Sequence, residues 1–530
     1  MRFHRRELLV AGGGLLGCGA AGTTAGATRR RRAGTASGNT AQGYGPLGSV
    51  TVEGAREAVV DGDVAYVAAG DGFAVVDIGD PTEPELLAER RAIETDTDQR
   101  LTGIWDVWPW EDRLAVAGPA AYNPELPSGV ALFDVSNPGD PQQVTFYPTQ
   151  DAIHNTHFEE GIVYLTGRDR GRSVVMVDVS DDDPEEVGRW SPLEVDERWA
   201  EVEPSLRTLH DVYVQNGRAY LPYWDAGTWI VDVSDPGEAS ALGHVGDYTL
   251  EELLAIDREE SFLVARTPRG ADHYATVNSD GSLLLVGGET WSIDDDGGVV
   301  GEAGQRVGGA SGVDLYDVSD PTSPERLSTI EPPASYDQTT GGWFTTSHNA
   351  DFRGDRLYTS WYFGGVAVHD VSDPATPEEL ARWQRPRETS FWTAQAADGF
   401  YVGSSTNLSA TFSGPNKTRE ALYTFPDEAG SQADPPALTD VPEDLVDVQP
   451  EELPEVDRLG ASASRVVDGP TDRNGDDGTG QNGDDGSDGE TDGSGTDGGE
   501  TGDDGGATDN GPTTGDSDDT SNGDPADGDT

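Results

Sequence analysis

The chain has 530 residues, of which 99 are Asp or Glu and 34 are Lys or Arg, so its formal net charge is −65 at pH 7. This surplus of carboxylates excludes nucleic acid as a partner, because the phosphates would be repelled. Lys417 is the one lysine. An acidic, lysine-poor surface is typical of proteins from brine, where the Debye length falls to about 3 Å, and we expect a haloarchaeal source.

The N-terminus reads as an export signal over residues 1–18. Arg5 and Arg6 precede a short apolar stretch and resemble a twin-arginine signal. The stretch is shorter than the ~20 residues of a membrane span, and it ends in a lipobox-like sequence whose last residue is Cys18. We therefore expect Cys18 to carry a lipid that anchors the protein to the membrane at the extracytoplasmic cell surface. The alternative is an N-terminus without a signal, in which the cysteine stands by chance. Residues 19–46 read as a linker.

A repeated phrase governs the rest of the chain. Asp-Val-Ser-Asp-Pro occurs at 232–236, 317–321 and 370–374, and near copies begin at Asp77, Asp134 and Asp178. Each copy closes an apolar run of five or six residues that is typical of a strand buried on both faces. A strand and turn that recur every few dozen residues indicate a repeat architecture, whose units must stack to bury their apolar faces.

Each phrase is preceded by a predicted hairpin, with turns such as Asp61-Gly62 and Asn216-Gly217. A seventh unit lacks the phrase but keeps a hairpin at 391–402 and a third strand at 421–425. Seven four-stranded units predict an all-β fold, a seven-bladed β-propeller over residues 47–426, in which 47–52 supplies the strand that closes the ring. An open β-solenoid is the alternative.

The apolar strand that ends in Asp-Val-Ser-Asp-Pro resembles the LVIVD repeat family, over about residues 50–425. The members of that family are extracytoplasmic, β-propeller-like proteins, most of them without an assigned reaction. The resemblance implies the fold and the location of the protein, and it says little about activity.

The C-terminal part has a different composition. Residues 427–466 read as a linker, and residues 467–530, rich in Asp, Gly and Thr, predict a disordered acidic tail, because such a segment has too little apolar surface to fold. Two sequons make Asn407 and Asn416 candidate glycosylation sites on an exported protein.

Four histidines occupy one position of the repeat. His154, His210 and His348 each stand ten residues before a tyrosine of the second strand, and His273 takes the same place with one extra turn residue. The other three units have Arg56, Trp105 and Phe391 there. Because the first strand of each blade lines the central channel, these residues are expected to form a ring at one mouth of it.

Imidazoles that face one axis, with Asp211 beside them, have the ligand types of a zinc or copper site. Asn155 and Asn349 are adjacent, and His157 could add a ligand. The arrangement resembles, in broad outline, the copper-binding selenium-binding-protein and methanethiol oxidase group. The alternative is structural: duplicated histidines whose ring nitrogens bond neighbouring backbone and seal each blade mouth.

Two functions therefore stay open. One is a surface-anchored scaffold that binds a protein or glycan partner. The other is a metal-dependent extracytoplasmic enzyme, with an oxidoreductase as one option. No Gly-x-Ser-x-Gly, phosphate-binding Gly loop or His-Glu-x-x-His motif is present.

Overall fold

The computed structural model describes residues 43–439, except 122, 182, 295–305 and 409–416. The chain divides into two units, residues 1–469 and 470–530. The predicted signal with Cys18, the candidate sequon at Asn416 and the acidic tail lie outside the described residues. Within the described part, no helix is both long and apolar enough to cross a membrane.

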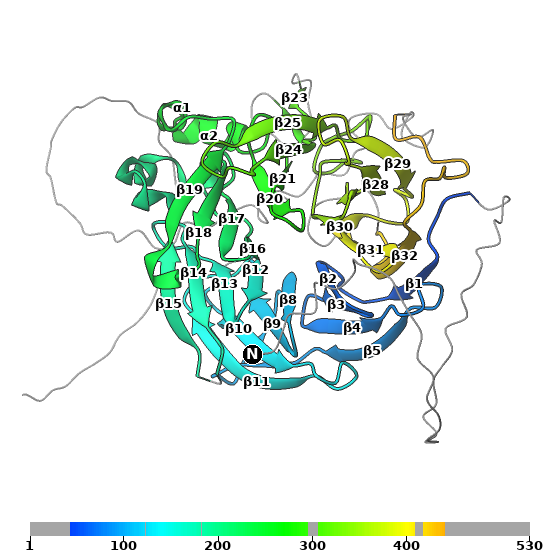
Figure 1. Ribbon diagram of the computed structural model, residues 1–530, viewed down its shortest axis with the longest axis horizontal. Helices are drawn as coiled ribbons and strands as arrows, with labels where there is room; N and C mark the ends of the chain where they lie inside the picture. The colour runs from blue at the N-terminus through cyan, green and yellow to red at the C-terminus, as the bar shows by residue number, and fades with distance from the viewer. Residues whose placement is uncertain (1–42, 122, 182, 295–305, 409–416, 440–530) are drawn as a thin grey trace, which may run out of the picture. The chain divides into compact units, whose positions relative to one another are not determined.

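The first unit contains the predicted seven-bladed β-propeller (Figure 1). Each blade is a four-stranded antiparallel sheet, and the innermost strands of neighbouring blades contact one another. From the innermost strand outward, blades 1 to 4 are β2 (Ala58–Asp61), β3 (Val64–Ala68), β4 (Phe73–Asp77) and β5 (Glu85–Arg90); β8 (Asp106–Trp110), β9 (Arg113–Gly118), β10 (Ser128–Asp134) and β11 (Gln142–Thr149); β12 (Thr156–Glu159), β13 (Ile162–Thr166), β14 (Val174–Asp178) and β15 (Glu185–Trp190); and β16 (Tyr213–Gln215), β17 (Arg218–Pro222), β18 (Thr228–Asp232) and β19 (Ser240–Val245).

Blades 5 to 7 follow the same order. They are β20 (Asp272–Val277), β21 (Leu283–Gly288), β24 (Val313–Asp317) and β25 (Glu325–Ile330); β26 (Ala350–Arg353), β27 (Arg356–Ser360), β28 (Val366–Asp370) and β29 (Glu378–Trp383); and β30 (Phe391–Ala396), β31 (Phe400–Ser405), β32 (Ala421–Pro426) and β1 (Gly48–Thr51).

Blade 7 joins the two ends of the propeller. Its three inner strands come last in the ring and its outer strand, β1, comes first, with Gly48 opposite Thr424 and Thr51 opposite Ala421. The predicted closing strand is therefore confirmed, and the open solenoid is excluded because the ring closes on itself.

The repeated phrase has a local cause. The carboxylate of Asp232 accepts hydrogen bonds from the backbone N–H of Ser234 at 3.0 Å and from its hydroxyl at 2.6 Å. Asp317 and Ser319 repeat this contact, at 2.9 and 2.6 Å. Such an Asx turn ends the third strand sharply, and the valine between the two residues is buried. A glycine marks the start of the third strand in blade 6. Gly365, just before β28, has a φ of 87°, and a Cβ there would lie 1.9 Å from the carbonyl oxygen of Trp383.

Insertions between blades and within blades 4 and 5 carry the remaining elements. They are the hairpins β6 (Ile93–Glu94) with β7 (Arg100–Leu101) and β22 (Ser292–Asp294) with β23 (Arg306–Gly308), the 3-10 helices η1 (Pro192–Glu194), η2 (Glu197–Glu201), η3 (Pro204–Leu206) and η4 (Pro236–Glu238), and the helices α1 (Leu250–Leu254) and α2 (Arg258–Val264). Between the blades, the apolar faces of the sheets pack directly, as where Phe73 of blade 1 meets Phe133 of blade 2 at 4.9 Å between ring centroids.

Residues 427–439, the described part of the predicted C-terminal linker, lie against the propeller. The side chain of Leu438 is buried, and its carbonyl accepts a hydrogen bond from the backbone N–H of Tyr336 at 2.8 Å. The carbonyl of Ser431 accepts one from Tyr44 at 2.9 Å, so this segment contacts the residues that lead into β1.

Candidate metal centre

One residue from each blade stands where the innermost strand begins. We call these seven residues the inner ring: Arg56, Trp105, His154, His210, His273, His348 and Trp392. Their place is set by the blade itself, because the backbone N–H of a ring residue bonds the end of the second strand. His210 donates to the carbonyl of Pro222 at 3.0 Å, and His348 donates to that of Ser360 at 3.0 Å.

The four predicted histidines lie in an unbroken row. Ring centroids are 4.4 Å apart for His154 and His210, 3.9 Å for His210 and His273, and 4.5 Å for His273 and His348. The repeat register therefore brings together, at one end of the propeller axis, residues that are 194 positions apart in the sequence at the extremes, His154 and His348.

Aromatic side chains and Arg56 complete the inner ring. Trp392 lies 4.3 Å from His348 and 5.7 Å from Trp105, and Trp105 lies 5.3 Å from His154, between ring centroids. The guanidinium carbon of Arg56 is 5.8 Å from the ring of Trp105 and 5.5 Å from that of Trp392.

The seventh ring position is Trp392, one residue beyond the Phe391 expected from the register. A β-bulge between Phe391 and Thr393 inserts one residue in β30, and Phe391 packs instead into the core between blades 6 and 7. The same irregularity between Asp272 and Tyr274 presents His273.

Backbone carbonyls orient three of the histidines. The Nδ1 atom lies 3.1 Å from the carbonyl oxygen of Ala120 in His154, 3.1 Å from that of His273 in His210, and 2.6 Å from that of Trp392 in His348. A carbonyl only accepts hydrogen bonds, so Nδ1 carries the proton and Nε2 keeps a lone pair. Such backbone contacts are what a structural histidine makes, and they are also how proteins orient histidines that bind metals.

Burial keeps these rings neutral. It lowers the pKa of His154 to about 4 and that of His348 to about 3, and the neighbouring positive charge of Arg168 acts in the same direction on His154. The pKa values of His210 and His273 fall well below 6.5, first because of burial and then because each faces other histidines of the row. Neutral imidazole is the form that binds a metal.

A second set of equivalent residues lies beside the inner ring. In each blade, one residue of the second strand is the last to pair with the third strand, and the member of this set lies two positions after it. The seven members are Gly70, Ala120, Arg168, Trp224, Glu289, Tyr362 and Asn407. We call this set the outer ring. Trp224 lies 4.9 Å from His210 and Tyr362 lies 4.9 Å from His348, between ring centroids. The candidate sequon residue Asn407 belongs to this ring and is half-buried.

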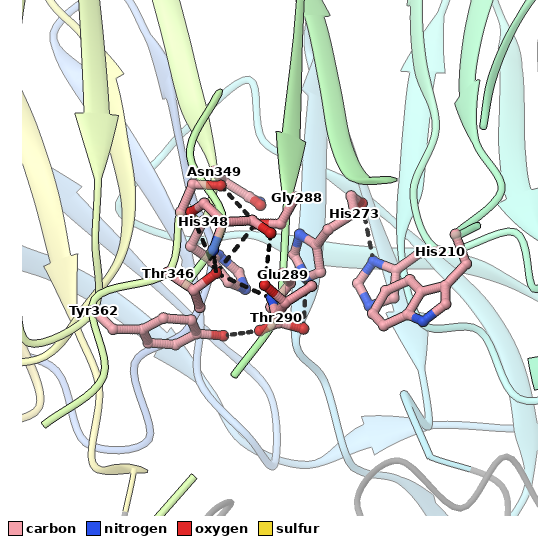
Figure 2. Close-up of polar contacts among 12 residues, drawn as sticks. His210, His273, Gly288, Glu289, Thr290, Thr346, His348, Asn349 and Tyr362 are labelled. Carbon is pink, nitrogen blue, oxygen red and sulfur yellow. Dashed lines mark hydrogen bonds and ion pairs between the residues drawn. The ribbon is translucent and has the colours of Figure 1, made fainter. Parts of the chain in front are cut away.

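Glu289 of the outer ring completes a set of metal-ligand type. Single ligand atoms of His210, His273 and Glu289 lie within 4.8 Å of one another. Oε2 of Glu289 is 3.5 Å from Nε2 of His273, and Oε1 accepts a hydrogen bond from the Tyr362 hydroxyl at 2.5 Å (Figure 2). Burial raises the pKa of Glu289 to about 7, although the Tyr362 hydrogen bond opposes this. Sequence reasoning missed Glu289, because the loops that follow the second strands share neither length nor sequence pattern.

Asp211, the acidic residue predicted to join the histidines, lies in a neighbouring layer. Its carboxylate accepts the backbone N–H of Val212 at 2.6 Å, and burial and the charge of Asp106 raise its pKa. The adjacent Asn155 donates to the carbonyl of His210 at 3.0 Å, and Asn349 donates to Glu57 at 2.5 Å. In the described part of the chain, Asp211 is not among the residues whose ligand atoms gather within 4.8 Å.

His157, named as an additional ligand, faces away from the row of histidines into the packing between blades. Its ring lies 4.1 Å from that of Trp108 and 5.1 Å from that of Tyr213, between centroids. Burial lowers its pKa to about 3, as expected for a neutral ring packed among aromatic side chains.

One family model matches two segments of the chain. The model of the LVIVD repeat matches residues 54–89 and 207–249, which cover blade 1 except its last residue, Arg90, and all of blade 4. Similar solved structures include the β-propeller domain of Cps50 (Swd1) from Myceliophteria thermophila, with 8% identity, a TM-score of 0.47, and coverage of 72% of this chain and 99% of that one. The RRP9 WD40 repeats show 9% identity, a TM-score of 0.44, and coverage of 72% and 99%.

No curated protein matches the chain. The chain is therefore a seven-bladed β-propeller that carries LVIVD repeats, as the closed ring of four-stranded sheets, the repeat phrase and the two matched segments show.

Proposed function

We propose that the histidine row and Glu289 bind one divalent transition metal, zinc or copper, and that the protein is a metal-dependent extracytoplasmic enzyme. The observation that carries this proposal is the approach of His210, His273 and Glu289 to within 4.8 Å. Two imidazoles and one carboxylate, with a coordination position left open, form a ligand set of catalytic zinc sites. His154 and His348 flank this set on either side.

The chemistry of the donors fits a metal. The histidines are neutral without any metal, so binding costs no deprotonation of imidazole. The Nδ1 atom of His273 is buried and has no hydrogen-bond partner among the described residues, which a purely structural histidine would ordinarily have. Tyr362, bonded to Glu289, is placed as the outer partner that orients a ligating carboxylate.

A bound metal would supply Lewis-acid chemistry or, for copper, electron transfer. The second candidate function is the scaffold without a reaction, which binds a protein or glycan partner at the cell surface. The closed propeller suits either function, since this fold hosts many unrelated activities. The gathered ligand set favours the enzyme.

Metal analysis tests the proposal. We expect wild-type protein to bind about one equivalent of zinc or copper, and His273→Ala or Glu289→Gln to weaken the affinity by at least about 100-fold, because one ligand is lost. Tyr362→Phe should cost about 10-fold, since it removes only the bond that orients Glu289. Titration calorimetry and elemental analysis after dialysis measure both effects.

His244→Gln is the matched control. His244 is also a buried imidazole with a ring nitrogen bonded to a carbonyl, that of Ala226 at 2.9 Å, but it stacks on Trp229 and stands outside the row. Its loss should leave metal affinity unchanged. Equal metal content in wild type and His273→Ala would make the row structural and return the scaffold function to first place.

We also propose that Cys18 anchors the protein to the membrane at the cell surface. The support is the sequence: the chain has a single cysteine, and it ends the apolar N-terminal stretch. A lipid with two acyl chains holds a protein stably on a membrane. Cys18→Ser is therefore expected to move the protein from the membrane fraction to the soluble or secreted fraction, as followed by immunoblotting. Retention of the variant in the membrane fraction would contradict the anchor.

A further inference from the structure

We infer that the axial end that carries the histidine row also binds a small oxyanion, with Arg168 as its principal ligand. Resting on the metal proposed above, the inference adds a substrate class: a compound with a carboxylate or another oxyanion group.

Arg168 occupies the outer-ring position of blade 3, two residues beyond the end of β13. This places it at the same end of the blade as His154, whose backbone N–H bonds the hydroxyl of Thr166 at 3.1 Å. Its charge contributes to the lowered pKa of both His154 and His210, so the guanidinium lies close to two members of the row. Arg168 of blade 3 therefore stands on the His154 side of the row, and the ligand set of blades 4 and 5 follows along it.

The guanidinium of Arg168 lacks a counter-ion in the described part of the chain. Its Nη1 atom is buried without a hydrogen-bond partner there, and no ion pair shorter than 4.0 Å reaches it from the described residues. Burial and then the repulsion of Arg172 lower its pKa to about 10, although Asp151 attracts it from a distance, so it stays charged at neutral pH. A buried guanidinium nitrogen without a partner is costly unless something satisfies it.

Other arginines of the same blade show the contrast. Arg189 bonds Glu186 at 2.6 Å and Asp169 at 3.4 Å. In a chain with 99 acidic and 34 basic residues, carboxylate partners are abundant. Arg207 also lacks a carboxylate, but its guanidinium donates to the carbonyls of Val202 and Arg170, whereas Nη1 of Arg168 has no such partner among the described residues.

The charges around the row favour an anion. The four histidines are neutral, and Arg56 stands in the inner ring between Trp105 and Trp392. The ligand set has one acidic member, Glu289, whose charge a bound divalent ion would offset. With a divalent ion bound, this end of the axis would be positive although the chain carries −65 overall.

Guanidinium groups recognise carboxylates and other oxyanions through two parallel N–H bonds. An anion held by Arg168 would present its reacting end toward the neighbouring ligand set of His210, His273 and Glu289. Arg168 is half-buried, so a small ligand can reach it from solvent. In this assignment Arg168 positions the substrate beside the residues that would hold the metal, His210, His273 and Glu289.

The test is a titration of the full-length, metal-loaded protein with formate and with sulfate at constant ionic strength, followed by tryptophan fluorescence. Trp224 and Trp105, which contact the row, serve as reporters. We expect saturable binding in wild type, and at least a 10-fold loss of affinity in Arg168→Gln. Arg189→Gln, which removes the same charge from the same blade, should bind as wild type does. Binding of formate but not sulfate would identify a carboxylate site, and binding of sulfate would identify a general oxyanion site.

A melting experiment separates this role from a structural one. Because Arg168→Gln removes a buried charge without a partner, its melting temperature should equal or exceed that of wild type. A lowered melting temperature with unchanged anion affinity, or no saturable response to either anion in wild type, would overturn the inference.

A second titration, on protein stripped of metal with a chelator, separates the inference from the metal proposal. Anion binding that depends on Arg168 while elemental analysis finds no metal in any preparation would reject the metal and keep the anion site. Stoichiometric metal binding without an anion response that depends on Arg168 would keep the metal site and reject the anion site.

Discussion

A chain that begins at Val52 is expected to lose most of its folding free energy, whereas one that begins at Gly43 keeps it. The difference between them is the segment that leads into and forms β1, the outer strand of blade 7. Its backbone makes bonds that no other residue replaces, among them Leu47 to the carbonyl of Thr424 at 2.8 Å and Tyr44 to that of Ser431 at 2.9 Å. The Tyr44 hydroxyl adds bonds to Tyr401 at 2.9 Å and to the carbonyl of Pro426 at 3.1 Å.

At about 1 kcal/mol for each hydrogen bond, five or more such bonds amount to roughly 5 kcal/mol. Whole domains are stable by only about 5–15 kcal/mol, so the loss is a large part of the total. It also leaves β32 as an exposed edge, a hazard for aggregation. Denaturant unfolding and size-exclusion chromatography of the two truncated chains measure both consequences. If both chains unfold at the same denaturant concentration, ring closure by β1 does not stabilise the propeller.

This closing strand and the row of histidines could be predicted because both follow from the repeat. The phrase around Asp232, Asp317 and Asp370 fixes where each third strand ends, and counting back from it gives the register of every other strand. Once the ring closes, equivalent positions must meet at one end of the axis. His154 and His348 could therefore be brought together without any knowledge of contacts.

Two kinds of residue could not be predicted in this way. Trp392 replaces Phe391 because a bulge shifts the strand by one residue, and a bulge leaves no mark in hydrophobic alternation. Glu289 and Arg168 follow second strands in loops of unequal length and unlike sequence, so they share no visible pattern with Gly70 or Ala120. Because the chain has 99 acidic residues, a single glutamate at a candidate site does not stand out in the sequence.

A second large effect is expected from pH, through the buried Asp106. Its Oδ2 accepts the backbone N–H of Thr156 at 2.7 Å, and its Oδ1 has no hydrogen-bond partner among the described residues. Burial raises its pKa to about 7, against the opposing hydrogen bonds from Thr156 and Val107. An aspartate in the unfolded chain titrates near 3.9, so the folded protein holds a proton that the unfolded chain has already lost. The resulting stabilisation is complete below about pH 4 and disappears as the pH rises through about 7.

The buried histidines act in the opposite direction, but at lower pH. With pKa values of about 4 for His154 and about 3 for His348, against about 6.5 when unfolded, they add stability as the pH rises to about one unit above 6.5. That gain is the same with or without the Asp106 carboxylate, so relative to a variant that cannot ionise at this position, the free energy of unfolding of wild type is expected to fall by on the order of 1 kcal/mol between pH 6.5 and 8.5.

Denaturant unfolding of metal-free protein across this interval measures the effect, with the metal removed so that its own pH dependence does not enter. Asp106→Asn keeps the size of the side chain and cannot ionise. Its free energy of unfolding should therefore change less steeply with pH than that of wild type, and the difference is the contribution of Asp106. Asp280→Asn is the control, because Asp280 is exposed and hydrogen bonds from Ser282 lower its pKa, which places its titration far below the interval. If the free energy of unfolding of Asp106→Asn depends on pH as steeply as that of wild type, Asp106 does not titrate between pH 6.5 and 8.5, and the prediction is wrong.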